Sequence, residues 1–222
     1  MNKIKALLFD LDGTLIDSES FHFDCWNAFL SDYNVSLTFT DWIANYSGIP
    51  MPVNAQTILR KYKLETTLEE IIAKREKLTM DRLNTIDIKL MPYVTEFLEF
   101  FYRKGLIMAI VTASPTNVLE VILKRNGLAK YFNTYVTRTD VQKSKPDPES
   151  YNLCIEKIQV AKSDCIVFED TINGVKAAVA ANITCFAIQN NIREHQKLKV
   201  ADQLFLNFEH AKNHIIQNHL ID

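Results

Sequence analysis

The sequence is poor in glycine, and its glycines do not follow the pattern of a dinucleotide-binding loop. Only five of the 222 residues are glycine, and the pattern Gly-x-Gly-x-x-Gly does not occur. The sequence therefore gives no support for a dinucleotide-binding fold of that type.

Cysteines and long apolar runs are also scarce. The four cysteines are widely scattered and form no Cys-x-x-Cys pair, which argues against a zinc site or a disulfide framework and for reduced thiols. The apolar run after Lys5 ends at Asp10, so it does not resemble a signal peptide. The apolar stretch 106–111 is far too short to span a bilayer. We therefore predict a cytoplasmic protein with no membrane partner.

An excess of positive charge is absent as well. The formal net charge is -2, and no run rich in Lys and Arg with interleaved aromatic residues is present, so nucleic acid is not a predicted partner. The hydrophobic content of 47% and the charged content of 23% are those of an ordinary globular protein with a substantial core. We expect it to be a monomer.

The stretch Ala6–Leu15 is the most informative part of the chain. An apolar run without strict alternation is typical of a strand buried on both faces, and here it ends in Asp10, Asp12, Gly13 and Thr14. Gly13 permits a sharp turn that leaves the backbone amides of residues 11–14 free to approach an anion. Two neighbouring carboxylates repel each other unless a cation or a shared proton holds them, which favours a hard divalent metal.

The pattern of the remaining chain predicts an α/β fold, a Rossmann-like parallel sheet with helices on both faces plus an inserted all-α domain. Residues 17–89 have helical spacing only, whereas residues 1–16 and 90–222 alternate strands with helices. Ser114 is expected to cap the helix that follows Pro115. The further strands are expected at 106–112, 134–137, 165–168, 183–188 and 203–206.

Other strand ends also carry polar groups. Thr112 ends one predicted strand, Glu169 and Asp170 follow another, and Lys145 lies in the loop between them. Because ligands of open parallel sheets bind beyond the carboxyl ends of the strands, we expect these side chains at one rim.

Four ordered motifs make the chain resemble the haloacid dehalogenase (HAD) superfamily, in the branch of small-sugar phosphatases and β-phosphoglucomutases. The motifs are Asp-Leu-Asp-Gly-Thr-Leu-Ile-Asp-Ser-Glu at 10–19, Thr-Ala-Ser at 112–114, Ser-Lys-Pro-Asp-Pro at 144–148 and Glu-Asp-Thr-Ile-Asn-Gly at 169–174. The resemblance implies that 1–16 with 90–222 form the catalytic core and that 17–89 form a helical cap, which closes over substrate and sets specificity.

The resemblance also implies roles for individual residues. Asp10 would be the nucleophile that becomes an aspartyl phosphate, and Asp12 the general acid and base. Thr112 and Lys145 would hold the transferring phosphoryl oxygens. Mg²⁺ would be bound by Asp10, the Asp12 carbonyl and Asp170, with Glu169 nearby. The residues expected to contact phosphate or substrate are Leu11, Gly13, Thr14, Ala113, Ser114 and the first cap helix's His22.

The predicted activity is Mg²⁺-dependent hydrolysis of a small phosphorylated metabolite, with a sugar phosphate as the expected class. A β-phosphoglucomutase-type phosphotransferase and a non-catalytic phosphometabolite-binding protein remain alternatives. The mutases carry an arginine soon after a cap glycine, whereas here Gly48 is followed by Ile-Pro-Met-Pro and the next cation is Arg60, which weakens the mutase alternative. A receiver-like module is disfavoured by the helical insert.

Two residues depart from the family's scaffold pattern. Tyr93 and Asn182 stand where relatives often have glycine, and asparagine is the better substitute because it tolerates a left-handed backbone. His210 and His214 have a spacing that can bind zinc, but no third ligand is evident, so we predict no zinc site there.

Overall fold

The computed structural model describes residues 3–221, which divide into two compact units. The core unit comprises residues up to 17 together with those from 89 onward, and the helical unit comprises 18–88. These junctions lie one residue from the predicted ones. Among the described residues, no helix combines the length and the apolar character needed to cross a membrane.

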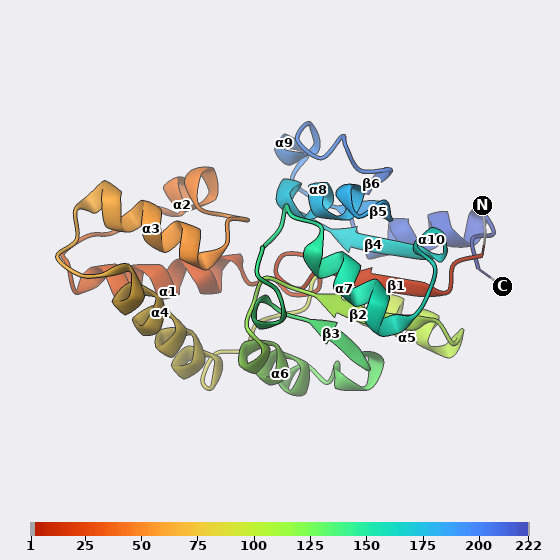
Figure 1. Ribbon diagram of the computed structural model, residues 1–222, viewed down its shortest axis with the longest axis horizontal. Coiled ribbons are helices and arrows are strands. Elements are labelled where there is room, and N and C mark those ends of the chain that lie inside the picture. Colours follow the sequence, from red (N-terminus) through yellow and green to blue (C-terminus); the bar gives the residue numbers. More distant parts are fainter. Residues whose placement is uncertain (1–2, 222) are drawn as a thin grey trace. The chain divides into compact units, whose positions relative to one another are not determined.

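A six-stranded, fully parallel sheet forms the middle of the core unit within the described residues (Figure 1). Its strand order is β3-β2-β1-β4-β5-β6, so the first strand of the chain lies near the centre with β2 and β4 as neighbours. The predicted α/β class with a parallel sheet is confirmed. The strands are β1 (Ala6–Phe9), β2 (Ile107–Val111), β3 (Thr134–Val136), β4 (Cys165–Glu169), β5 (Thr184–Ile188) and β6 (Gln203–Phe205).

Helices cover both faces of this sheet. Alternate residues of β1 point to opposite faces, so Leu8 joins a cluster with α7 and α8, while Phe9 packs among aromatic rings that include Phe97 of α5 and Phe208 of α10. The core helices and short 3₁₀ turns are α5 (Val94–Arg103), α6 (Thr116–Arg125), η1 (Ala129–Tyr131), η2 (Arg138–Asp140), α7 (Glu149–Ile158), η3 (Lys162–Asp164), α8 (Ile172–Ala180), α9 (Ile192–His195) and α10 (Phe208–Gln217).

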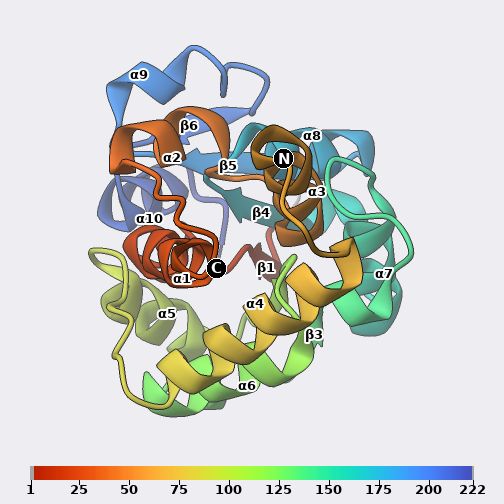
Figure 2. The same cartoon turned by 90° about the vertical axis from the view of Figure 1, so that its left-hand side faces the viewer.

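The helical unit contains α1 (Glu19–Ser31), α2 (Phe39–Asn45), α3 (Met51–Tyr62) and α4 (Leu68–Leu83), and α4 packs against α1 and α3 (Figure 2). Its own apolar cluster is centred on Trp26, Phe29 and Trp42, which are almost completely buried. The carboxylate of Glu19 accepts hydrogen bonds from the Trp42 indole and, at 2.9 Å, from the Ser47 hydroxyl. These bonds link the start of α1 to α2 and to the loop that follows it.

The chain leaves the core and returns to it at one place. Ile16 and Leu90 form an antiparallel bridge, and the Asp17 amide donates to the Lys89 carbonyl at 2.8 Å. The helical unit is therefore an insertion whose two ends are joined by backbone hydrogen bonds.

Two departures from the glycine pattern have a backbone explanation. Tyr93 has φ = 65° and Asn182 has φ = 57°, so both occupy the left-handed region that glycine enters without strain. Tyr93 immediately precedes α5, its ring is half-exposed, and its backbone adopts a conformation that is costly for a residue with a Cβ atom.

Candidate active site

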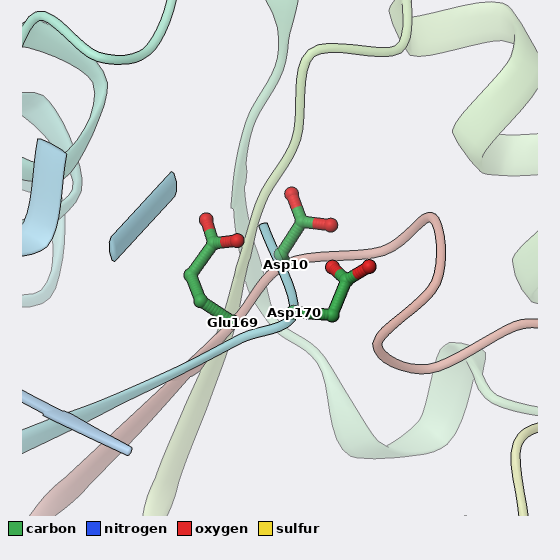
Figure 3. A group of neighbouring side chains, drawn as sticks. All are labelled: Asp10, Glu169 and Asp170. Atoms are coloured by element: carbon green, nitrogen blue, oxygen red, sulfur yellow. The ribbon is translucent and has the colours of Figure 1, made fainter. Parts of the chain in front are cut away.

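Three carboxylates meet where β1 and β4 end. Asp10 follows β1 directly, Glu169 is the last residue of β4, and Asp170 comes next. Phe9 and Phe168 are in register, and the Asp10 amide donates to the Phe168 carbonyl at 2.9 Å. One carboxylate oxygen from each acid lies within 4.8 Å of the others, and Figure 3 shows the three side chains gathered beside these strand ends.

Lys145 connects this group to the neighbouring strand. Its buried ammonium donates to Asp10 Oδ1 and Glu169 Oε1, both at 2.6 Å, and to the carbonyl of Val111 at 2.7 Å. These bonds use all three donors of the ammonium group. Burial alone would lower the pKa of Lys145, but the charges of Asp10 and Glu169 outweigh burial and raise it, so the side chain stays charged.

The acidic group carries more negative charge than Lys145 neutralises. Burial raises the pKa of Asp10 to about 8 in spite of the adjacent Lys145 charge, and repulsion from Glu169 and Asp12 adds to the rise. A cation placed among these carboxylates would oppose that rise, because an opposite charge favours the ionised form. Hard oxygen donors of this kind suit Mg²⁺.

The residues present fit such a cation. Glu169 Oε2 is buried and has no hydrogen-bond partner among the described residues, although a buried carboxylate oxygen normally has one. Two glycines leave room for these carboxylates: a Cβ on Gly13 would lie 2.2 Å from Asp170 Oδ2, and a Cβ on Gly174 would lie 1.9 Å from Glu169 Oε2.

Two predicted phosphate-binding residues have other contacts in the structure. The fully buried Thr14 donates its hydroxyl to Asp170 Oδ1 at 2.9 Å, so it orients a carboxylate. The Gly13 amide donates to the Ile16 carbonyl at 2.9 Å, and the prediction that this amide is free for an anion is wrong. Gly13 has φ = 80°, so the turn itself requires glycine.

The second aspartate is held from the end of β2. Ser114 donates its hydroxyl to Asp12 Oδ2 at 2.8 Å, and its amide donates to Thr112 Oγ1 at 3.0 Å. The predicted capping role of Ser114 is wrong, because α6 begins at Thr116 with Pro115 as its N-cap and no side-chain cap. The Ser114 hydroxyl bonds to Asp12 instead of to an orphan amide of the helix.

A small pocket adjoins Lys145 in the core unit. It is lined by Thr112, Ala113, Arg138, Val141, Ser144, Lys145 and Ser150. Among the predicted residues, Thr112, Ala113 and Lys145 therefore lie together. Leu11 has a completely buried side chain, and His22 lies on α1 of the helical unit with its ring edge-on to Phe21.

The two histidines of α10 lie elsewhere. The ring of His214 packs against Phe186 and Phe205, with ring centroids 5.6 and 5.2 Å away. This residue is part of the aromatic packing at β5 and β6.

Sequence reasoning missed Tyr151 and the spatial role of Gly174. Tyr151 is completely buried on α7, and its hydroxyl donates to Glu169 Oε1 at 2.6 Å. A signal existed, because Tyr151 and Cys154 lie on the apolar face of the helix and a buried tyrosine hydroxyl needs a partner. Which acceptor it reaches depends on the packing of α7 against the sheet.

Comparison with known proteins bears on this site. The family model for haloacid dehalogenase-like hydrolases matches residues 7–188. The "Phosphorylated carbohydrates phosphatase" of Thermotoga maritima is 32% identical over 180 residues, covering 81% of this chain and 82% of that protein. The "Fructose-1-phosphate phosphatase YqaB" of Escherichia coli is 32% identical over 179 residues, covering 80% and 93%.

The fold recurs in the crystal structure of CbbY from Rhodobacter sphaeroides in complex with phosphate. The TM-score is 0.83 at 22% identity, with 92% of this chain and 95% of that chain covered. The chain belongs to the haloacid dehalogenase-like hydrolases, as its motifs predict. It is thus an enzyme of a hydrolase family, and both relatives named above are phosphatases.

Proposed function

We propose that this protein is a Mg²⁺-dependent phosphatase that hydrolyses a small phosphorylated metabolite, with sugar phosphates as the substrate class. The observation that carries the proposal is the cluster of Asp10, Glu169 and Asp170 at the carboxyl ends of β1 and β4, where Lys145 donates to Asp10 and Glu169. The names of the two relatives support phosphorylated carbohydrates as substrates.

In the first step, an Asp10 carboxylate oxygen attacks phosphorus and forms an aspartyl phosphate, while the bond from phosphorus to the leaving oxygen breaks. Asp12 donates a proton to that oxygen, and the hydrogen bond from Ser114 holds Asp12 for this task. In the second step, Asp12 takes a proton from water as the water oxygen attacks phosphorus. The Asp10 carboxylate and inorganic phosphate are thereby released.

Lys145 and Thr112 stabilise the charge on the transferring group. The Lys145 ammonium already lies 2.6 Å from Asp10 Oδ1, so its charge is next to the carboxylate that reacts. Asp10, the Asp12 carbonyl, Asp170 and Glu169 would hold Mg²⁺. When bound, Mg²⁺ supplies positive charge that neutralises phosphoryl oxygens and offsets the repulsion among the carboxylates.

The helical unit is the proposed source of substrate specificity. His22 is its candidate contact to substrate, on the first helix after the catalytic loop. The loop before α3 has Ile-Pro-Met-Pro after Gly48, so it lacks the guanidinium with which the mutases grip a second phosphate. A monophosphate substrate agrees with that absence.

The test is phosphate release from a panel of sugar phosphates, measured with Mg²⁺ and again after EDTA. Wild type should turn over at least one sugar phosphate and lose that activity in EDTA. Asp10→Asn removes the nucleophile and should abolish turnover. Asp12→Ala removes the acid and base and should slow turnover by about 10²–10⁴-fold.

Asp32→Asn is the matched control, because Asp32 is an exposed carboxylate at the end of α1 in the helical unit. It should have wild-type activity. Interconversion of glucose 1-phosphate and glucose 6-phosphate without phosphate release would replace the proposal by a mutase. Absence of turnover on every ester would leave a binding protein.

A further inference from the structure

The two oxygens of the Glu169 carboxylate have different surroundings. Oε1 accepts hydrogen bonds from Lys145 Nζ and from the Tyr151 hydroxyl, both at 2.6 Å. Oε2 is buried and, within residues 3–221, has no hydrogen-bond partner. Side chains of the protein therefore satisfy Oε1, whereas Oε2 is available to a group from outside the protein.

Tyr151 lies on α7 and contacts the Glu169 carboxylate from that helix. Its ring is completely buried, and the Lys145 ammonium lies 5.1 Å from the ring centroid. A buried hydroxyl without an acceptor would be costly, so the contact restrains both partners.

We propose that Tyr151 is a positioning residue for the cation site: it fixes the rotation of the Glu169 carboxylate so that the unpaired oxygen, Oε2, stays available to a cation held together with Asp10 and Asp170. This inference rests on the proposed function, since it takes Mg²⁺ as the cation. It assigns Tyr151 no contact with substrate. Its effect passes through Glu169 alone.

The geometry explains why one hydroxyl matters. Gly174 leaves room for the whole Glu169 carboxylate, because a Cβ there would lie 1.9 Å from Oε2 and 2.1 Å from Oε1, so this group fits closely against α8. Without the Tyr151 hydroxyl, Lys145 is the remaining donor to Oε1 in the hydrogen-bond network described here, and Lys145 also serves Asp10. The carboxylate could then rotate, and partners that orient a metal ligand typically contribute 10–100-fold in metal affinity or activity.

The direct test is Mg²⁺ binding to the substrate-free protein by isothermal titration calorimetry. Tyr151→Phe, which removes only the hydroxyl, should weaken Mg²⁺ binding about 10-fold. Tyr135→Phe is the matched control, because the Tyr135 hydroxyl donates to exposed Glu120 at 3.1 Å on another part of the core unit. It should bind Mg²⁺ as wild type does.

A double-mutant cycle separates positioning from a general structural effect. In a Glu169→Gln background, the carboxylate that Tyr151 is proposed to orient is gone, so adding Tyr151→Phe should change Mg²⁺ affinity by less than about 2-fold. Thermal unfolding of all four proteins establishes that they are folded. An equal loss in both backgrounds would show that Tyr151 acts by another route and would overturn the inference.

The outcomes also separate this inference from the proposed function. Mg²⁺ binding and turnover by wild type, with unchanged affinity in folded Tyr151→Phe, would overturn the role of Tyr151 and keep the phosphatase. Wild type that neither binds Mg²⁺ nor releases phosphate would overturn both. In the presence of saturating Mg²⁺, Tyr151→Phe should recover most of its turnover, whereas Asp10→Asn should not.

Discussion

At the scale of single residues, the site depends on two glycines, which have no side chain, as much as on its acidic residues. Gly174 lies in the first turn of α8, and its missing Cβ leaves the space that the Glu169 carboxylate occupies. Gly13 does the same for Asp170 and also has a positive φ. The turn after β1 and the start of α8 thus both require glycine beside a carboxylate.

Gly174→Ala should therefore lower both stability and activity. Replacing a helical glycine by alanine ordinarily gains about 0.5–1 kcal/mol, but here the methyl group would meet a buried carboxylate. Such overpacking typically costs about 1–3 kcal/mol. Chemical denaturation and phosphate release measure the two effects.

Gly105→Ala is the control for that prediction. Gly105 has φ = 74° with nothing within 4 Å of the added Cβ, so the variant should lose stability through backbone strain and keep wild-type turnover. If Gly174→Ala were as active as wild type, Glu169 would not need the space that Gly174 provides.

At the scale of elements, the half-buried carboxylate of Glu99 links α5 to the short turn η1. Glu99 accepts from Arg103 at 2.7 Å on its own helix, and from the Tyr131 hydroxyl at 2.8 Å and Lys130 at 3.2 Å on η1. The Tyr131 hydrogen bond, followed by those from Arg103 and Lys130, lowers the pKa of Glu99 to about 2. Three donors thus hold this carboxylate in its charged form.

This contact should make stability depend on pH below neutrality. Because the pKa of Glu99 falls from 4.5 to about 2 on folding, its contribution is fully present above pH 4.5 and is lost as the pH falls toward 2. Glu99→Gln should therefore be less stable than wild type at pH 6, and the difference should shrink between pH 4.5 and 2. Urea denaturation over that range gives the measurement, with Glu96→Gln on the same helix as the control.

Elements were predictable from the sequence where local signals and burial agree. The spacing of Glu149–Ile158 predicts α7 with its observed bounds, and Pro and Gly bracket α5. The apolar pattern of 175–181 predicts a helix that begins at Val175, but α8 begins at Ile172 because Thr171 provides its N-cap. The predicted capping role of Ser114 was wrong because a serine before proline resembles an N-cap in the sequence. Its observed hydrogen-bond partner, Asp12, lies 102 residues away in sequence.

The candidate site was predictable only in part, because some of its contacts join residues that are far apart in the sequence. The acids at strand ends follow from the rule that parallel strands end at one rim, which needs no knowledge of packing. Tyr151 and Gly174 act through distances across the fold, and a sequence contains no such distances. The engagement of the Gly13 amide by Ile16 depends on how the turn closes.

At the scale of the whole molecule, reduced cysteines lie in both units. All four are free and buried, with Cys25 in the helical unit and Cys154, Cys165 and Cys185 in one apolar cluster of the core. Burial raises the pKa of Cys154 and Cys165 to about 12, which suppresses the reactive thiolate. The reactivity of each thiol therefore reports on the unfolding of the unit that contains it.

Native protein should leave all four thiols unreactive toward Ellman's reagent, and denatured protein should expose four. In rising denaturant, the three core cysteines should become reactive together, since they share one cluster. Mass spectrometry of alkylated peptides resolves each site, and Cys25 provides the separate signal of the helical unit. Reaction of one core cysteine well before the other two would contradict a single cooperative core.

The hydrogen-bonded junction between Asp17 and Lys89 has a consequence for divergence. Because the helical unit starts and ends at adjacent backbone positions, lengthening or shortening it should leave the strand register of the core unit unchanged. Insertions and deletions between 18 and 88 would therefore leave in place the strand ends that carry Asp10, Glu169 and Asp170, so a lineage could rebuild the helical unit without altering that cluster.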